Sequence, residues 1–264
     1  MKHYAYESPF KMKDPDGNLY TLKVETEDDP LDPRQWSNVS TMVCWHRHYR
    51  LGDKHAFETP DEFMQHLYLD VTGTHWCDQH NTDDWEEVLK ELQESDLVLI
   101  KPLNLYDHGG ITISTSSGYP YNDRWDAGCV GFVFITKKTA LENLGGIPKC
   151  DDYGKPVMVV KKLSNGKSVL AAEYEPISED NWKQVAEYCI DEEVETYDQY
   201  LRGDVYGYQL LKTVVEQQKC PHCGEVLREY EIEEEVDSCG GFYGSCLEEN
   251  GIFDNIPDLQ FIEN

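Results

Sequence analysis

Basic residues are scarce in this sequence. Its 264 residues include 23 Lys and Arg against 51 Asp and Glu, which gives a formal net charge of −28. A surface this negative repels nucleic acid and anionic membranes at long range. We therefore expect no direct binding to a phosphate backbone, and the natural complement of the chain is a basic protein.

Long apolar runs and a disulfide framework are also missing. No run of about eighteen apolar residues, the length of a membrane helix, occurs anywhere. Residues 1–13 have no apolar core of signal-peptide length. The nine cysteines are odd in number and mostly far apart, which favours a reducing compartment. These absences predict a soluble protein of the cytoplasm.

The motifs of several enzyme classes are absent as well. The sequence has no phosphate-binding Gly-x-x-x-x-Gly-Lys-Ser/Thr loop, no dinucleotide-binding fingerprint and no Gly-x-Ser-x-Gly nucleophile turn. The segment Asp107-His108-Gly109-Gly110 is similar to an esterase oxyanion loop, but the chain offers no nucleophile turn to accompany it. We assign its glycines to turn conformations and close backbone approach.

Turn signals and apolar periodicity predict both strands and helices. Strands are expected around the turns at residues 14–18 and Asn165-Gly166, and over residues 41–45, 205–211 and 225–237. Helices are expected to begin at Thr59, Asp83 and Ser178, and Gly203 is expected to end the third of these. The pattern predicts one α+β domain over residues 1–264, with a mainly antiparallel β-sheet and three to four packed helices.

Four cysteines near the C-terminus suggest a metal site. Cys220-Pro221-His222-Cys223 has the spacing of a zinc knuckle, and Cys239 and Cys246 follow. The later pair is seven positions apart, which is irregular for a zinc ribbon, and His222 is an alternative ligand. We weigh a structural zinc ion clipping the hairpin at residues 217–246 equally against two reduced surface thiols.

Acidic residues gather in two places. Alternation along the predicted strand puts one set on a single face, with carboxylates about 6.6 Å apart: Glu229, Glu231, Glu233, Glu235 and Asp237. A second set lies on the longest predicted helix: Asp191, Glu192, Glu193 and Glu195. Either set alone is typical of a solvated surface. Together, with no basic stripe near them in the sequence, they favour a binding face for a cationic partner.

Histidines and aromatic residues provide two further groups of candidates. A metal-dependent hydrolase is suggested by the group His46, His48, Asp53 and His55, with a second group of His75, Cys77, Asp78 and His80. The first group departs by three extra residues from the ligand run of the metallo-β-lactamase fold, so a polar loop is favoured. Aromatic anchors for a protein interface are Tyr119, Tyr121, Trp125, Tyr206, Tyr208, Phe242 and Tyr243, although core packing is favoured for Tyr208 and Phe242.

Three motifs taken together resemble a known family. They are LYDHGGITIS at residues 105–114 with WDAG at 125–128, YDQYLRGDVYG at 197–207, and DSCGGFYG at 237–244; HRHYRLGD at 46–53 is similar to an early motif. The family consists of acidic, uncharacterised proteins carried by bacteriophages and integrated mobile elements. The resemblance implies a phage genome context, in which small acidic proteins often disarm host enzymes that handle nucleic acid.

The leading hypothesis is therefore a binding protein without catalytic activity. It would be a phage or mobile-element inhibitor that binds a basic, nucleic-acid-processing defence enzyme of the host, partly by nucleic-acid mimicry. One alternative is a metal-dependent hydrolase or nuclease that uses His46, His48 and Asp53, together with Asp107. Another is a phage accessory protein that serves assembly through protein contacts.

Overall fold

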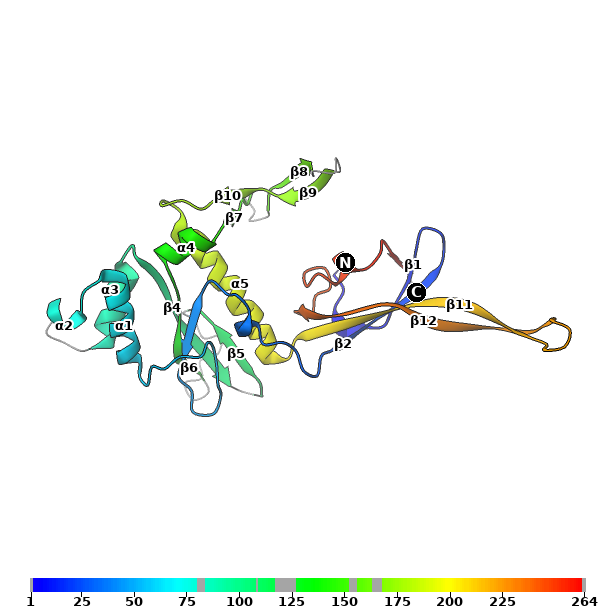
Figure 1. The fold of residues 1–264 in the computed structure, drawn as a ribbon, viewed down its shortest axis with the longest axis horizontal. Coiled ribbons are helices and arrows are strands. Elements are labelled where there is room, and N and C mark those ends of the chain that lie inside the picture. The colour runs from blue at the N-terminus through cyan, green and yellow to red at the C-terminus, as the bar shows by residue number, and fades with distance from the viewer. Residues whose placement is uncertain are drawn as a thin grey trace. The chain divides into compact units, whose positions relative to one another are not determined.

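A computed structural model of the chain describes residues 2–79, 84–107, 109–116, 127–151, 156–162 and 168–262. Within these residues the fold is α+β and the strands pair in antiparallel sheets, as the sequence predicts (Figure 1). The sequence pattern predicts one domain, whereas the contacts of the chain divide it into two compact units. Unit 1 is Met1–Pro33 with Asp198–Asn264, and unit 2 is Arg34–Tyr197. None of the described helices combines the length and apolar character needed to cross a membrane.

Unit 1 is built on a five-stranded sheet with the order β12-β11-β2-β1-β13. Its strands are β1 (Phe10–Lys13), β2 (Leu19–Thr26), β11 (Val205–Lys219), β12 (Val226–Tyr243) and β13 (Gln260–Phe261). The short helices η1 (Ala5–Glu7) and α6 (Ile252–Asn255) belong to the same unit. Apolar side chains on one face of the sheet, among them Met12, Leu22 and Leu210, form the core of unit 1. The predicted opening hairpin, β1 and β2, is confirmed.

Unit 2 is built on a four-stranded sheet with the order β3-β6-β4-β5. Its strands are β3 (Thr41–Cys44), β4 (Val98–Asp107), β5 (Ile111–Ser114) and β6 (Ala127–Thr136). The described helices of this unit are α1 (Pro60–Thr72), α2 (Trp76–Gln79), α3 (Trp85–Glu94) and α4 (Lys137–Asn143). Helices η2 (Pro33–Gln35) and α5 (Trp182–Arg202) lie mostly in it and cross its two ends. Phe63, Val88 and Ile100 join α1 and α3 to one face of the sheet. Lys101, on the other face of β4, pairs with Glu187 of α5 at 2.7 Å, so α5 covers that second face.

Two short ribbons extend unit 2. Strand β7 (Gly146–Pro148) pairs with β10 (Tyr174–Pro176), and β8 (Met158–Lys162) pairs with β9 (Ser168–Ala172). The second pair confirms the strands of the hairpin predicted around Asn165-Gly166, while the turn itself lies outside the described residues.

The helix boundaries agree with the sequence in part. Thr59 caps α1 as predicted, with its Oγ1 accepting from the Glu62 N–H at 3.3 Å. For α3 the capping side chain is Asp84, which accepts from the Glu86 N–H, rather than Asp83. Helix α5 begins at Trp182, and Ser178 instead donates its N–H to Asn181 Oδ1 at 2.7 Å. Gly203 follows α5 with a φ of 76°, as expected for a helix stop.

Gly131 of β6 is required by the tight pairing of β3 with β6. It lies opposite Cys44, and a Cβ at this position would stand 2.0 Å from the Val43 carbonyl oxygen and 2.8 Å from the Cys44 Cα. Both are backbone atoms of β3, so a methyl group fits only if the strand moves. Gly128, near the start of β6, has nothing within 4 Å of the equivalent position.

Gly131→Ala should lower the free energy of unfolding of unit 2 by about 2 kcal/mol or more, because overpacking forces the backbone to shift. Gly128→Ala in the same strand should change it by less than about 0.5 kcal/mol. All six tryptophans lie within residues 34–197, so tryptophan fluorescence during urea unfolding of the full chain reports on unit 2. Equal effects of the two substitutions would contradict this reading of the β3–β6 contact.

Candidate functional site

The β11–β12 hairpin is longer than the sheet that supports it. Strand β2 pairs with β11 only as far as Tyr20 opposite Lys212. Beyond that pair, residues 213–219 of β11 pair with residues 226–233 of β12 and with no third strand among the described residues. We call residues 213–233 the arm; its distal end projects past β1 and β2 (Figure 1). A two-stranded ribbon of this kind leaves both faces open to solvent.

The β11–β12 hairpin carries a row of carboxylates on one face, which starts in the arm and continues to Glu235 at its base. Glu229, Glu231, Glu233 and Glu235 lie opposite Gln217, Val215, Thr213 and Leu211, respectively. Residues directly opposite in an antiparallel pair share a face, so these four glutamates are confirmed on one side of the sheet. The Gln217 side chain donates to Glu229 Oε1 at 2.7 Å, and Gln209 donates to Glu235. The row is thus ordered by cross-strand bonds as well as by the strand.

Asp237 does not belong to this row, contrary to the sequence prediction. Leu210 lies opposite Asp237 while Leu211 lies opposite Glu235, so Val236 is an extra residue that reverses the alternation. The Asp237 carboxylate turns to the core face and accepts from the Tyr208 hydroxyl at 2.7 Å. Burial, followed by this hydrogen bond, raises the pKa of Tyr208.

Basic residues also approach the row, which the sequence did not suggest. Glu233 accepts from the Thr21 hydroxyl at 2.6 Å and from Lys11 Nζ at 3.1 Å, and Lys23 Nζ lies 4.0 Å away. The hydrogen bonds from Thr21 and then Lys11 lower the pKa of Glu233. In the part of the chain that the structure describes, Glu229, Glu231 and Glu235 form no ion pair. These three carry the uncompensated charge of the row.

The second acidic set, on α5, is largely structural. Glu193 accepts from the Val39 N–H at 2.8 Å and from Arg34 Nη1 at 3.2 Å. Asp191 pairs with Lys101 at 3.0 Å. Glu192 and Glu195 are exposed. All four belong to unit 2 whereas the arm belongs to unit 1. Glu193 is corrected from a binding residue to a partly buried partner of Arg34.

The proposed hydrolase residues do not assemble into a metal site. Asp53 binds Arg34 through both oxygens, at 3.0 and 2.8 Å, and accepts from the Met42 N–H. His46 Nδ1 accepts from the backbone N–H groups of His48 and Tyr49, at 3.3 and 3.2 Å. His55 Nε2 is bonded to the Cys44 carbonyl. Among the described residues, no group of three or more His, Cys, Asp and Glu has the geometry to hold a metal ion. His80 lies outside the described residues, so the second histidine group is incomplete.

Most of the aromatic candidates either pack within unit 1 or lie outside the described residues. Tyr208 and Phe242 are buried in the core of unit 1, as favoured from the sequence, and Tyr206 is half-buried against them. The Tyr243 hydroxyl donates to the Leu31 carbonyl. Tyr119, Tyr121 and Trp125 lie outside the described residues.

The glycines of the DSCGGFYG segment bring the end of β12 close to Glu27. Glu27 accepts from the Gly241 N–H, and a Cβ on Gly240 would lie 2.0 Å from Glu27 Oε1. Gly207, from the YDQYLRGDVYG segment, also faces Glu27 Oε1, at 3.6 Å from its ideal Cβ position. Two of the segments behind the family resemblance therefore meet around one carboxylate, and they are part of the framework of unit 1.

The four cysteines of the predicted zinc clip are not brought together. Cys220 and Cys223 lie in the turn at the tip of the arm. The last strand pair before this turn is Lys219 with Val226. Cys239 lies opposite Tyr208, eleven residues back along β11, which is about 36 Å at ~3.3 Å per residue. Cys246 is buried, and its backbone pairs with Tyr4 in an isolated antiparallel β-bridge. One ion cannot bind all four, and only the Cys220–Cys223 pair remains together.

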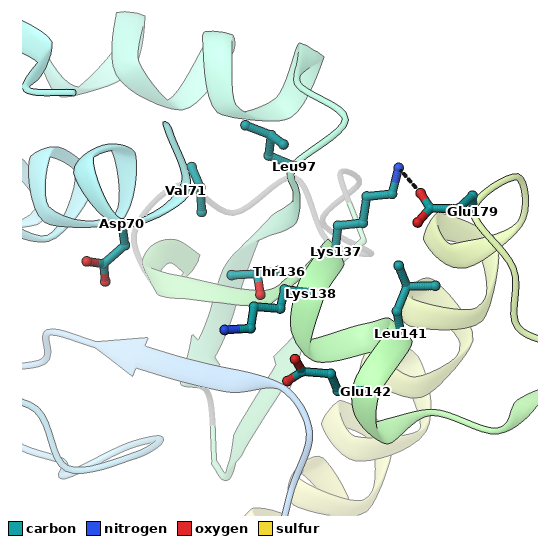
Figure 2. A pocket seen from close by; sticks show the side chains of 9 residues that line it. All are labelled: Asp70, Val71, Leu97, Thr136, Lys137, Lys138, Leu141, Glu142 and Glu179. Carbon is teal, nitrogen blue, oxygen red and sulfur yellow. Dashed lines mark ion pairs between the residues drawn. The ribbon is translucent and has the colours of Figure 1, made fainter. Parts of the chain in front are cut away.

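A pocket that the sequence did not predict lies in unit 2. It measures about 620 Å³ and is bounded by α1, the segment before β4, and α4, with Glu179 at one side (Figure 2). Lys137 pairs with Glu179 at 2.6 Å and with Asp96 at 2.7 Å. No histidine or cysteine is among the lining residues, and acidic and basic side chains are mixed. This mixed lining does not indicate a particular reaction or ligand.

Arg34→Ala should lower the free energy of unfolding of unit 2 by about 3–5 kcal/mol, because it leaves Asp53 and Glu193 unpaired. The Arg34 side chain is 2% exposed. Lys149→Ala removes an exposed pair with Glu173 in the same unit and should cost no more than about 1 kcal/mol. Tryptophan fluorescence during urea unfolding measures both, and a small effect at Arg34 would show that the two carboxylates are not held by it.

Comparisons of the chain with protein-family models, curated proteins and solved structures return no match. The resemblance to phage-borne acidic proteins therefore stays a prediction.

Proposed function

We propose that this chain is a binding protein that presents the carboxylates of its arm to the basic nucleic-acid cleft of another protein. The observation that supports this most directly is that Glu229, Glu231 and Glu235 share one face and lack ion pairs within the described residues. Glu229 and Glu231 stand on the arm, where β11 has no third strand beside it, and Glu235 lies where β11 also pairs with β2. On a strand, Glu229 and Glu231 are about 6.6 Å apart, and Glu231 and Glu235 about 13 Å apart. To a cationic groove, such a row is a line of fixed negative charges, as the phosphates of a nucleic acid are.

Exposed apolar side chains on the arm support a role in protein binding. Val215 is 61% exposed and lies opposite Glu231, in the middle of the acidic face. Tyr230, on the other face, is 39% exposed and donates to Glu216. Apolar contacts at such positions supply affinity, while the charges around them set orientation and the association rate.

The overall charge favours the same kind of partner. With a net charge of −28, the chain attracts basic surfaces and repels nucleic acid, and salt screens both effects over about 10 Å at 0.1 M. From the resemblance to phage-borne acidic proteins, we further propose that the chain is a phage or mobile-element inhibitor. Its target would be a host nucleic-acid-processing defence enzyme in the bacterial cytoplasm.

Replacing Glu229, Glu231 and Glu235 together by Gln should weaken binding to the partner by about tenfold or more at low salt, mainly through a slower association rate. It should also flatten the salt dependence of the affinity. The partner is first recovered by affinity purification from host cells, and association is then measured by surface plasmon resonance from low to high salt.

The matched control is the triple replacement of Glu86, Glu87 and Glu94 by Gln on the exposed side of α3, which removes the same charge from unit 2. It should leave the affinity nearly unchanged. Duplex DNA should displace the chain from its partner, because both occupy one cleft. Equal losses in the two triple variants, or a complex indifferent to DNA, would refute mimicry by the arm.

A further inference from the structure

The tip of the arm is a closed turn with a cysteine on each side. The Cys220 N–H donates to the Glu225 carbonyl at 2.8 Å, and the Gly224 N–H donates to the Cys220 carbonyl at 2.9 Å. Gly224 has a φ of 77°, which a residue with a side chain rarely adopts. These bonds hold Cys220 and Cys223 on one short loop, the spacing at which two thiolates bind one tetrahedral ion.

The turn also orders the sulfur of Cys220. The backbone N–H groups of Cys223 and His222 donate to it. Lys219 and Arg228, the basic residues of the arm, lie in the strand positions nearest the turn. Positive charge beside a cysteine stabilises the deprotonated form that binds metals.

The same chain does not complete the site. Zn²⁺ in a structural site takes four ligands in a tetrahedron, and the tip supplies two. Cys239 stands about 36 Å back along the hairpin, from eleven residues at ~3.3 Å each. Among the described residues, no third His, Cys, Asp or Glu joins the pair in a metal-holding group. A four-ligand site at the tip therefore has two positions for groups from a second molecule.

We infer that the tip is half of a Zn²⁺ site, and that two copies of this chain complete it tip to tip with Cys220 and Cys223 of each copy. A two-fold axis through the ion gives four equivalent thiolates, the soft ligand set that Zn²⁺ prefers. Four thiols lose their protons as the ion binds, including the Cys223 proton directed at Glu225.

Two further features of the tip suit a second copy. Val226 and Leu227, directly after the turn, are 47% and 62% exposed, and a second tip would cover them. The arm also places the turn beyond β1 and β2 of its own unit (Figure 1), while Lys219 and Arg228 offset the nearest carboxylates of the approaching copy. This inference is independent of the proposed function, since neither requires the other.

The test uses the full chain, reduced and stripped of metal, and titrates it with Co²⁺ and then Zn²⁺. Co²⁺ should produce the thiolate charge-transfer and tetrahedral visible bands of four-sulfur coordination, and Zn²⁺ should remove them. The endpoint should be one ion per two chains. Sedimentation should show the mass doubling from 30.5 kDa on adding Zn²⁺ and returning on adding EDTA.

Cys220→Ser with Cys223→Ser should abolish the bands and the dimer, with unchanged circular dichroism as the check on folding. Cys239→Ser, which replaces an exposed cysteine of β12, should retain both the bands and the dimer. The inference is overturned by one ion per monomeric chain, by absence of the cobalt bands, or by a dimer that persists in the double variant. A mixed nitrogen–sulfur spectrum that His222→Ala changes would overturn it as well.

Discussion

Strand β11 pairs along both edges at the base of unit 1 and along one edge only beyond Lys212. Where it is doubly paired, its side chains alternate between the core, as at Leu210, and the outer face. Where it is singly paired, both faces are open, and the same alternation spreads carboxylates and apolar residues over the arm. Strand β11 thus contributes to the core of unit 1 at its base and forms one strand of the arm, whose acidic face the proposed function uses.

The scarcity of cations shapes unit 2 in a related way. Arg34 binds Asp53 and Glu193, Lys101 binds Glu187 and Asp191, and Lys137 binds Asp96 and Glu179, so each cation serves two carboxylates. Burial of a charge requires such partners. These three cations join elements of unit 2, and with 23 Lys and Arg against 51 Asp and Glu the chain keeps a large excess of carboxylates.

Local signals predicted most of the elements correctly. The Thr59 cap, the Gly203 stop and the hairpin strands depend on residues a few positions apart, and such effects act before distant parts of the chain meet. The Asp84 cap of α3 and the start of α5 at Trp182 differ from the prediction by a few residues, because neighbouring polar side chains compete for the same backbone groups. The division of the chain into two units had no signal in composition.

The candidate site was predicted in part. Alternation placed Glu229 to Glu235 on one face, but a single extra residue, Val236, moved Asp237 to the other. Lys11 and Thr21 reach Glu233 from more than two hundred positions away. The four cysteines looked like one site because they are close in sequence, whereas an extended strand separates residues by about 3.3 Å each.

The sequence by itself determined the negative charge, the α+β class, the acidic strand and the paired thiols of the turn, because these depend on residue type and short-range spacing. Only the tertiary structure decided which charges are neutralised, where the alternation breaks, and how far the turn stands from Cys239. Those outcomes depend on strand register and on which distant side chains arrive beside one another, and register is set by the packing of the whole sheet.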